Sequence, residues 1–367
     1  MRLIKDVGTR ERGRAFSGEV VVDGSVCYDF VVSLRALFNP RTFTRTRRWS
    51  ASRLPQLPAA LLPKAKFLFQ GFDTSLGYGA ARIVGRLASD AVPADLIRAV
   101  SQMPPAELAL FMLDTGETSQ ERLDLYRGVL AGDDTLTNRA VAGLPAGWAT
   151  RCRQVLRDPD QARSDLVEVL GVYLERIYAQ HLDSVRDRIT AAIPVAEKML
   201  DILPPSAAIE QLTGGYTIGA DLGLTKITMA PSVFIHPFMS ARLDERTGEA
   251  LVIYGLSSDF FDAYDPVPVR HELIAALKAM ADPNRLALLE ILSGGEVYAT
   301  ELTSRLGLAQ PTVHHHLAQL RTAGLIRQER DRHGMRYSIR PDSADALLRS
   351  LRDLLGSPAP DLDPPED

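Results

Sequence analysis

Polar side chains suited to contacting DNA bases gather in the last quarter of the chain. The segment that begins at Gln310-Pro311 carries apolar residues at helical spacing, Val313, Leu317 and Leu320, which would face a core. The side chains directed away from that core are then Gln310, Thr312, His314, His315 and Gln319. Glutamine can pair with adenine edges, and threonine can contact a base edge or a thymine methyl group. The pattern predicts a helix that reads bases in the major groove.

A cluster of arginines follows this helix. Between residues 321 and 340, six arginines are opposed by Glu329 and Asp331 alone, although the whole chain has a net charge of −4. The positive charge is therefore local, as a surface that meets DNA phosphates requires. We expect the contacts to phosphates to come from Arg327, Arg330, Arg332 and Arg336.

Three helices and a hairpin are predicted to position these side chains. Asp282-Pro283 marks the start of the first helix, and Gly294-Gly295 marks its end. A short helix at about 299–306 ends at Gly307, and the third helix runs from about 310 to 323. Two short strands joined around 332–334 follow. This order is that of a winged helix-turn-helix, in which the third helix enters the major groove and the hairpin contacts the flanking backbone.

The segment from Leu306 to Ile326, LGLAQPTVHHHLAQLRTAGLI, together with Asp282-Pro-Asn-Arg285, resembles the ArsR/SmtB family of winged-helix repressors. The resemblance implies a homodimer formed by the helix before Asp282, at about 271–280, and the C-terminal helix, at about 342–355. It also implies that the dimer reads a near-palindromic operator and regulates transcription. Half-sites about one helical turn apart would match the two-fold axis of such a dimer.

The positions at which members of this family bind metal carry other residues here. Tyr298 and Thr300 stand at the family's thiolate positions, and residues 342–355 contain no histidine. Successive side chains of the run His314–His316 diverge by about 100 degrees on a helix, so they cannot easily share one ion. We therefore expect no metal, no cofactor and a non-metal signal. Ala309, where the family commonly has a capping serine, and His314, where a small hydroxyl residue is usual, leave the operator sequence open.

The fold class expected for the whole chain is α+β. We predict an N-terminal regulatory domain over 1–261, helical to about residue 200 and strand-rich over 207–256, with a small antiparallel sheet. A long helical pattern over 161–200 contains Pro194, which should kink or divide it. A linker over 262–269, a winged helix-turn-helix domain over 270–356 and a disordered acidic tail over 357–367 complete the chain.

Little in the first 261 residues indicates catalysis. The chain contains no GxSxG, P-loop, HExxH or Rossmann GxGxxG pattern, and its two cysteines, Cys27 and Cys152, form no metal or disulfide motif. Parts of this region, such as FVVSLRALFNP and PSVFIHPF, resemble an uncharacterised domain fused to winged helices in bacteria. We expect the basic stretch from Arg41 to Arg53, with Trp49, to be a solvated loop rather than a phosphate contact. No segment reads as a leader or a membrane span, so we expect a cytoplasmic protein.

Three hypotheses follow. The favoured one is a non-enzymatic DNA-binding regulator that represses transcription, as the family resemblance implies, and that has an operator, a second copy of itself and a small-molecule effector as partners. The alternatives are a protein-interaction scaffold that uses its winged helix to meet a partner and, with less support, a DNA-tethered enzyme. No membrane partner is expected.

Overall fold

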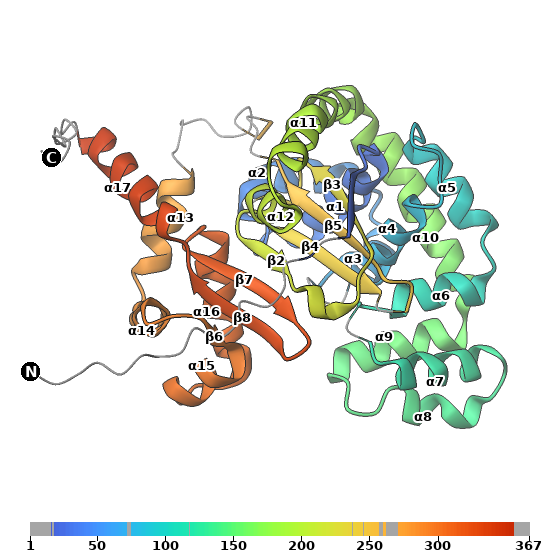
Figure 1. Cartoon of the computed structure of the whole chain (residues 1–367). Helices are drawn as coiled ribbons and strands as arrows, with labels where there is room; N and C mark the ends of the chain where they lie inside the picture. The colour runs from blue at the N-terminus through green and yellow to red at the C-terminus, as the bar shows by residue number, and fades with distance from the viewer. Residues whose placement is uncertain are drawn as a thin grey trace, which may run out of the picture. The chain divides into compact units, whose positions relative to one another are not determined.

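The computed structural model describes residues 16, 18–71, 75–116, 118–236, 238–244, 246–256, 260–261 and 271–355 (Figure 1). The contacts divide the chain into two compact units. The helical unit comprises the described residues of 20–198 and 226–266, and the winged unit comprises the described residues of 1–19, 199–225 and 267–367. The expected boundary near residue 262 is thus corrected, because residues 199–225 pack with the C-terminal part. The predicted linker over 262–269 and tail over 357–367 lie outside the described residues.

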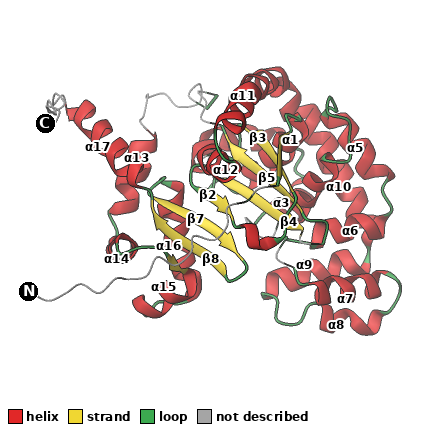
Figure 2. Ribbon diagram, in the orientation of Figure 1, coloured by secondary structure: helices red, strands yellow, loops and turns green. Residues whose placement is uncertain are grey.

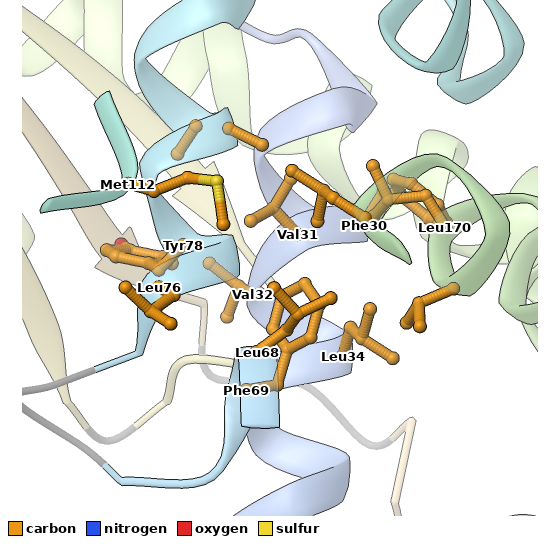
Figure 3. Close-up of a cluster of buried hydrophobic side chains, with 14 of the residues drawn as sticks. Phe30, Val31, Val32, Leu34, Leu68, Phe69, Leu76, Tyr78, Met112 and Leu170 are labelled. Atoms are coloured by element: carbon orange, nitrogen blue, oxygen red, sulfur yellow. The ribbon is translucent and has the colours of Figure 1, made fainter. Parts of the chain in front are cut away.

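Helices make up most of the helical unit, as predicted. The first, α1 (Val26–Phe38), is buried along its whole length because almost all of its side chains are apolar, and Ser25 caps it by accepting a hydrogen bond from the Cys27 backbone N–H. Figure 3 shows its aliphatic and aromatic side chains packed against neighbours from several other helices. The others are α2 (Arg47–Arg53), α3 (Leu62–Phe69), α4 (Ala81–Val84), α5 (Pro93–Gln102), α6 (Pro105–Leu113), α7 (Gln120–Leu130), α8 (Thr137–Ala140), α9 (Ala146–Arg157), α10 (Pro159–Tyr173) and α11 (Leu182–Ile202).

The predicted long helix over 161–200 is divided, but not at Pro194. A π-helical turn at Leu174–Tyr178 and a 3-10 turn at Ala179–His181 separate α10 from α11, whereas Pro194 lies inside α11. The wider turn changes which face of the chain points inward, so that Tyr173, Ile177 and Tyr178 are all buried. Packing of large aromatic rings, rather than proline, therefore decides where this segment breaks.

The sheet of the helical unit is mixed, so the predicted antiparallel sheet is wrong in part. Its strands are β1 (Glu19–Val22), β3 (Lys226–Ser232), β4 (Met239–Asp244) and β5 (Glu249–Gly255), in the order β1-β3-β5-β4 (Figure 2). The pair β4–β5 is antiparallel, as expected, but β3 pairs with β5 in parallel. Because β5 takes a central position with one partner on each side, the chain must cross over between β3 and β4. Alternation of residue types could not predict that crossover.

One buried carboxylate ties this sheet to the helices. Asp29 of α1 is fully buried, and its Oδ1 accepts hydrogen bonds from Ser232 Oγ (2.6 Å) and from the backbone N–H groups of Val233 (2.7 Å) and Phe234 (3.2 Å). Its Oδ2 accepts a hydrogen bond from the Tyr178 hydroxyl at 3.0 Å. Burial raises the pKa of Asp29, and these donors oppose that effect. The group therefore joins α1, the end of β3 and the π-helical turn at one point.

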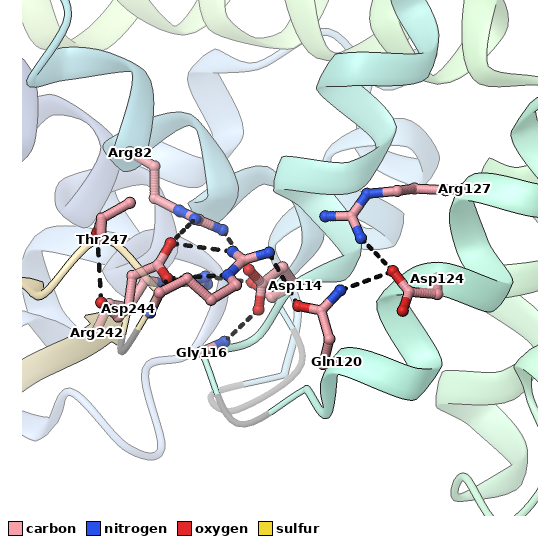
Figure 4. Close-up of polar contacts among 10 residues, drawn as sticks. Arg82, Asp114, Gly116, Gln120, Asp124, Arg127, Arg242, Asp244 and Thr247 are labelled. Atoms are coloured by element: carbon pink, nitrogen blue, oxygen red, sulfur yellow. Dashed lines mark hydrogen bonds and ion pairs between the residues drawn. The ribbon is translucent and has the colours of Figure 1, made fainter. Parts of the chain in front are cut away.

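A second polar network joins β4 to the helices around it (Figure 4). Arg82 of α4 lies 2.5 Å from an oxygen of Asp114 and 3.6 Å from one of Asp244, while Arg242 donates to the backbone carbonyl of Asp114. Burial, and then the neighbouring charge of Arg82, lower the pKa of Arg242 to about 10. These contacts fix the edge strand against the loop that follows α6.

The basic stretch 41–53 is more ordered than the predicted solvated loop. Arg47 and Arg48 are exposed, as expected, but residues 47–53 form α2, and Trp49 is completely buried. The Trp49 indole N–H donates to His181 Nε2 at 3.4 Å, and the ring also packs edge-on against Phe234. The aromatic residue of this stretch therefore belongs to the core.

Acid is expected to destabilise the helical unit through two histidines. Burial, and secondarily the charges of Arg53 and Arg45 respectively, lower the pKa values of His181 and His236 from 6.5 to about 4. Between these values the unfolded chain binds more protons than the folded one, so stability is present above pH 6.5 and is lost as the pH falls towards 4. At pH 5 each histidine should cost about 2 kcal/mol. Denaturant unfolding at pH 7 and pH 5 measures the loss.

His181→Gln supplies the control for this acid effect. Glutamine keeps an acceptor for the Trp49 indole but cannot titrate, so the variant should lose about half as much stability between the two pH values as the unchanged chain. An equal loss in both proteins would show that His181 is not a source of the acid sensitivity.

The winged unit has the predicted order of elements. It contains α13 (His271–Met280), α14 (Pro283–Ser293), β6 (Val297–Tyr298), α15 (Ala299–Leu306), α16 (Gln310–Thr322), β7 (Ile326–Asp331), β8 (Gly334–Ile339) and α17 (Pro341–Leu355). Asp282 caps α14 by accepting a hydrogen bond from the Arg285 N–H, and Gly307, with φ +64°, ends α15. Ala309 offers α16 no side-chain cap, as its sequence indicated. The α+β class and the winged helix-turn-helix are confirmed.

Two further elements belong to this unit and were not expected there. Residues 205–213 form helix α12 (Pro205–Thr213) instead of strand, because Pro205 starts a helix readily and Gly214 ends it in the left-handed conformation. After it, β2 (Tyr216–Ile218) joins the sheet of the wing, whose strand order is β2-β7-β8-β6. In the described part of the chain, no helix combines the length and apolar character needed to cross a membrane.

Candidate nucleic-acid interface

Helix α16 has the two faces that its sequence predicted. Val313, Leu317 and Leu320 are buried and pack with residues of α14, α15 and the wing strands. The structure exposes Gln310, Thr312, His314, His315 and Gln319. All five predicted base-reading residues are therefore accessible to solvent.

The third histidine of the run has a different environment. His316 is buried, with its Nδ1 at 3.7 Å from Oδ1 of Asp282. Because Asp282 also caps α14, this contact places the first turn of α14 against the middle of α16. Of the three, His314 and His315 are exposed and His316 is buried.

Arg285 connects three helices beneath the exposed face. Its Nε donates to the Ala279 carbonyl (2.5 Å) and its Nη2 to the Lys278 carbonyl (2.8 Å), so it satisfies the end of α13. Its Nη1 donates to Oε1 of Gln319 at 2.9 Å. The amide nitrogen of Gln319 lies 3.1 Å from Nε2 of His315. The orientations of Gln319 and His315 thus depend on a residue outside the recognition helix, which residue spacing alone did not reveal.

The arginines of the wing differ in how much of their charge remains available. Arg327 pairs with Glu210 of α12 at 2.6 Å, and Arg336 pairs with Glu329 at 2.5 Å and with Glu296 at 3.2 Å. The structure therefore holds two of the four predicted phosphate contacts in ion pairs within the winged unit.

The other two arginines lie nearer the tip of the wing. Arg332 is exposed between β7 and β8, whereas Arg330 is half-buried near the end of β7. Arg332 is consequently the member of the predicted set whose guanidinium is best placed to meet a phosphate.

The segment corresponding to the family's metal-binding positions has a structural role. Tyr298 donates from its hydroxyl to Oδ2 of Asp331 at 2.7 Å, which links β6 to the far end of β7, and this bond raises the pKa of Tyr298. Thr300 is exposed on α15. Among the described residues, no three histidine, cysteine, aspartate or glutamate side chains are grouped so that they could hold a metal ion.

Large apolar side chains are exposed on the helices at the two ends of the winged unit. Ile274 and Leu277 lie on α13, and Leu348, Leu354 and Leu355 lie on α17. The two helices contact each other, so these side chains come from neighbouring elements. Exposed apolar groups of this kind are typical of a surface that associates with another chain.

The fold and the exposed face of α16 together define a winged helix-turn-helix protein that binds DNA. Residues 282–328 match the model of the family described as "Bacterial regulatory protein, arsR family". The chain is 40% identical over 81 residues to the HTH-type transcriptional regulator YgaV of Escherichia coli K12, covering 22% of this chain and 82% of that protein. It belongs to the ArsR family, and it is a DNA-binding transcriptional regulator.

Other relatives agree with this assignment. The nodulation protein NolR of Rhizobium meliloti is 37% identical over 93 residues, which is 24% of this chain and 76% of NolR. The arsenical resistance operon repressor of Staphylococcus xylosus is 31% identical over 80 residues, which is 22% of this chain and 77% of the repressor. These similarities extend over about the length of a winged helix and leave most of this chain unmatched.

Proposed function

We propose that this regulator is a repressor that binds a near-palindromic operator as a homodimer and responds to a non-metal effector through its helical unit. The observation that carries the proposal is the exposed polar face of α16, opposite a fully buried apolar stripe. In this proposal Gln310, Thr312, His314, His315 and Gln319 read bases. The helical unit is regulatory rather than catalytic, and the protein acts in the cytoplasm.

The homodimer would form through α13 and α17. The exposed side chains of Ile274, Leu277, Leu348, Leu354 and Leu355 would be covered by the same residues of a second copy. A two-fold axis would then present two α16 helices to successive major grooves on one side of the duplex.

The signal is proposed to be non-metallic because of what replaces the family's thiolates. Tyr298 is committed to Asp331, and Thr300 offers a neutral hydroxyl, which is a poor ligand for soft metals. We expect a small effector to bind the helical unit, which makes up most of the chain. Such an effector would act by binding one arrangement of the dimer more tightly than another.

Arginines near the tip of the wing would contact phosphates. Arg332 is exposed there, and Arg330 precedes it on β7. Phosphate contacts fix the register of a protein on DNA without reading the sequence, so their loss should weaken binding to every duplex to a similar extent.

The test begins with footprinting of the purified full-length chain on genomic DNA at fixed salt, which yields the operator. His314→Ala should then weaken operator binding about tenfold and relax the preference at one base position in each half-site. Arg332→Gln should weaken binding to all sequences and make the plot of log affinity against log salt shallower by about 1.8, because each subunit of the homodimer loses one phosphate contact.

Arg336→Gln is the matched control for the wing. Its guanidinium is already neutralised by Glu329 and Glu296, so the salt dependence should be unchanged. No sequence-specific footprint at any salt concentration would contradict the proposal and favour the scaffold hypothesis, in which the winged helix meets a protein.

A further inference from the structure

A segment preceding the C-terminal winged helix is built into the wing. We call residues 205–222, which comprise α12, β2 and the turn at Ala220–Leu222, the clasp. Strand β2 pairs in parallel with β7, with Tyr216 opposite Gln328 and Ile218 opposite Arg330. Figure 1 shows β2 beside β7 in the winged unit. The clasp therefore extends the sheet of the wing by one strand.

Backbone hydrogen bonds extend the pairing at both ends of β2. The Gln328 N–H donates to the Gly215 carbonyl (2.7 Å), and the Gly219 N–H donates to the Arg330 carbonyl (2.8 Å). Gly215 has φ +115°, and a Cβ at this position would lie 3.0 Å from Cδ of Arg340. Since other residues rarely adopt this conformation, the close approach of clasp and wing requires glycine here.

The clasp also places two carboxylates on the wing. Glu210 Oε1 lies 2.6 Å from Nε of Arg327, and the two side chains are 22% and 36% exposed. Asp221 Oδ2 accepts a hydrogen bond at 2.9 Å from the backbone N–H of Arg332, at the tip. One acid thus neutralises a wing arginine, and the other brings negative charge to the point where a phosphate would lie.

The clasp is continuous in sequence with the helical unit on both sides. It follows α11, most of which belongs to the helical unit, and it precedes β3, which is a strand of that unit's sheet. A change in the helical unit that moves the ends of α11 or β3 would therefore pull directly on the strand that pairs with the wing.

We propose that the clasp is an intramolecular inhibitor of DNA binding. While β2 is paired with β7, Glu210 occupies Arg327 and Asp221 repels phosphates from the wing tip. When the clasp is withdrawn, Arg327 becomes available for a phosphate and the repulsion is removed. This inference rests on the proposed function and supplies a route by which the helical unit regulates the winged helix.

The test is the double variant Glu210→Gln/Asp221→Asn of the full-length chain, measured on the footprinted operator and on an unrelated duplex over a range of salt concentrations. Affinity for both duplexes should rise about tenfold at low salt, and the salt slope should steepen by about 1.8 because each subunit of the homodimer neutralises one more phosphate. Glu290→Gln, which removes an exposed acid on α14 and leaves both carboxylates of the clasp in place, should change neither quantity.

Arg327→Gln tests whether the freed guanidinium causes the gain. In the unchanged chain this substitution should leave the salt slope as it is, because Arg327 is already paired. In the double variant, the same substitution should return the salt slope to that of the unchanged chain. Circular dichroism and thermal unfolding of each variant verify that the winged unit remains folded.

The possible failures are distinguishable. If the double variant binds DNA more weakly or with an unchanged slope while remaining folded, the clasp supports the wing and the inhibitor proposal is overturned. If the unchanged chain and every variant bind no duplex at any salt concentration, the result contradicts the proposed function and, with it, the clasp proposal.

Discussion

Arg285→Ala is expected to weaken operator binding at least tenfold and to lower the free energy of unfolding of the winged unit by about 2–3 kcal/mol. The side chain is only 12% exposed, and its guanidinium donates to the carbonyls of Lys278 and Ala279 and to Gln319. Its removal leaves the last carbonyl groups of α13 without a hydrogen-bond donor, and it removes the positive charge that offsets the negative end of the helix dipole. It also frees Gln319, and with it His315, to adopt other rotamers.

The measurements are denaturant unfolding and binding to the operator and to a scrambled duplex. If Arg285 has only a structural role, the variant should bind the operator and the scrambled duplex more weakly to the same extent, because less of the protein is folded. If Arg285 positions Gln319 and His315, the preference for the operator over the scrambled duplex should fall even where the variant is fully folded. Arg285→Lys keeps the charge but loses the planar fork, so it should recover part of the stability and little of the preference. Full operator preference in folded Arg285→Ala would contradict the positioning role.

Asp29→Ala is expected to destabilise the helical unit by about 3–5 kcal/mol. The substitution leaves the Ser232 hydroxyl and the backbone N–H groups of Val233 and Phe234 without their acceptor in a fully buried site. The Tyr178 hydroxyl keeps a contact with the Val26 carbonyl at 3.4 Å, so it contributes less to the loss. Denaturant unfolding, followed by a signal from the helical unit, measures the effect.

Asp29→Asn separates the hydrogen bonds from the charge. The amide oxygen can accept the same three donors, and the amide nitrogen can donate to the Tyr178 hydroxyl, which then donates to Val26. The loss should therefore be only about 1 kcal/mol. Equal losses for the alanine and asparagine variants would show that the negative charge, and not the set of hydrogen bonds, stabilises this junction.

The variants of Arg285 and of the clasp test two parts of one regulatory hypothesis. Arg285 connects the end of α13, which we propose to lie in the dimer interface, to two side chains proposed to read DNA. The clasp connects the chain of the helical unit to the wing. An effector could then act on the recognition helix and on the wing by separate physical routes, and the variants of Arg285, Glu210 and Asp221 distinguish them.

Much of the winged helix followed from local sequence. Capping by Asp282, a proline in the first turn of α14, left-handed Gly307 and the stripe Val313, Leu317 and Leu320 are short-range features, since each depends on residues within a few positions. They predicted the bounds of α15 and α16 closely, and they predicted which side of α16 would be exposed. The family assignment rests on the same residues.

The partners of the charged side chains did not follow from local sequence. Glu210 is more than a hundred positions from Arg327, and no periodicity connects them; Asp221 and the tip of the wing are equally remote. The same holds for Asp29 and Ser232, and for β3 and β5, which are neighbours only because β4 lies on the far side of β5.

The sequence of this protein therefore specified a winged helix, its exposed polar face and its local positive charge, because helix caps and apolar stripes act over a few residues. The tertiary structure specified which arginines remain available, which side chain orients Gln319, and that residues 205–222 pair with the wing. Those properties depend on long-range packing, in which a strand or a carboxylate takes whichever partner the fold brings to it.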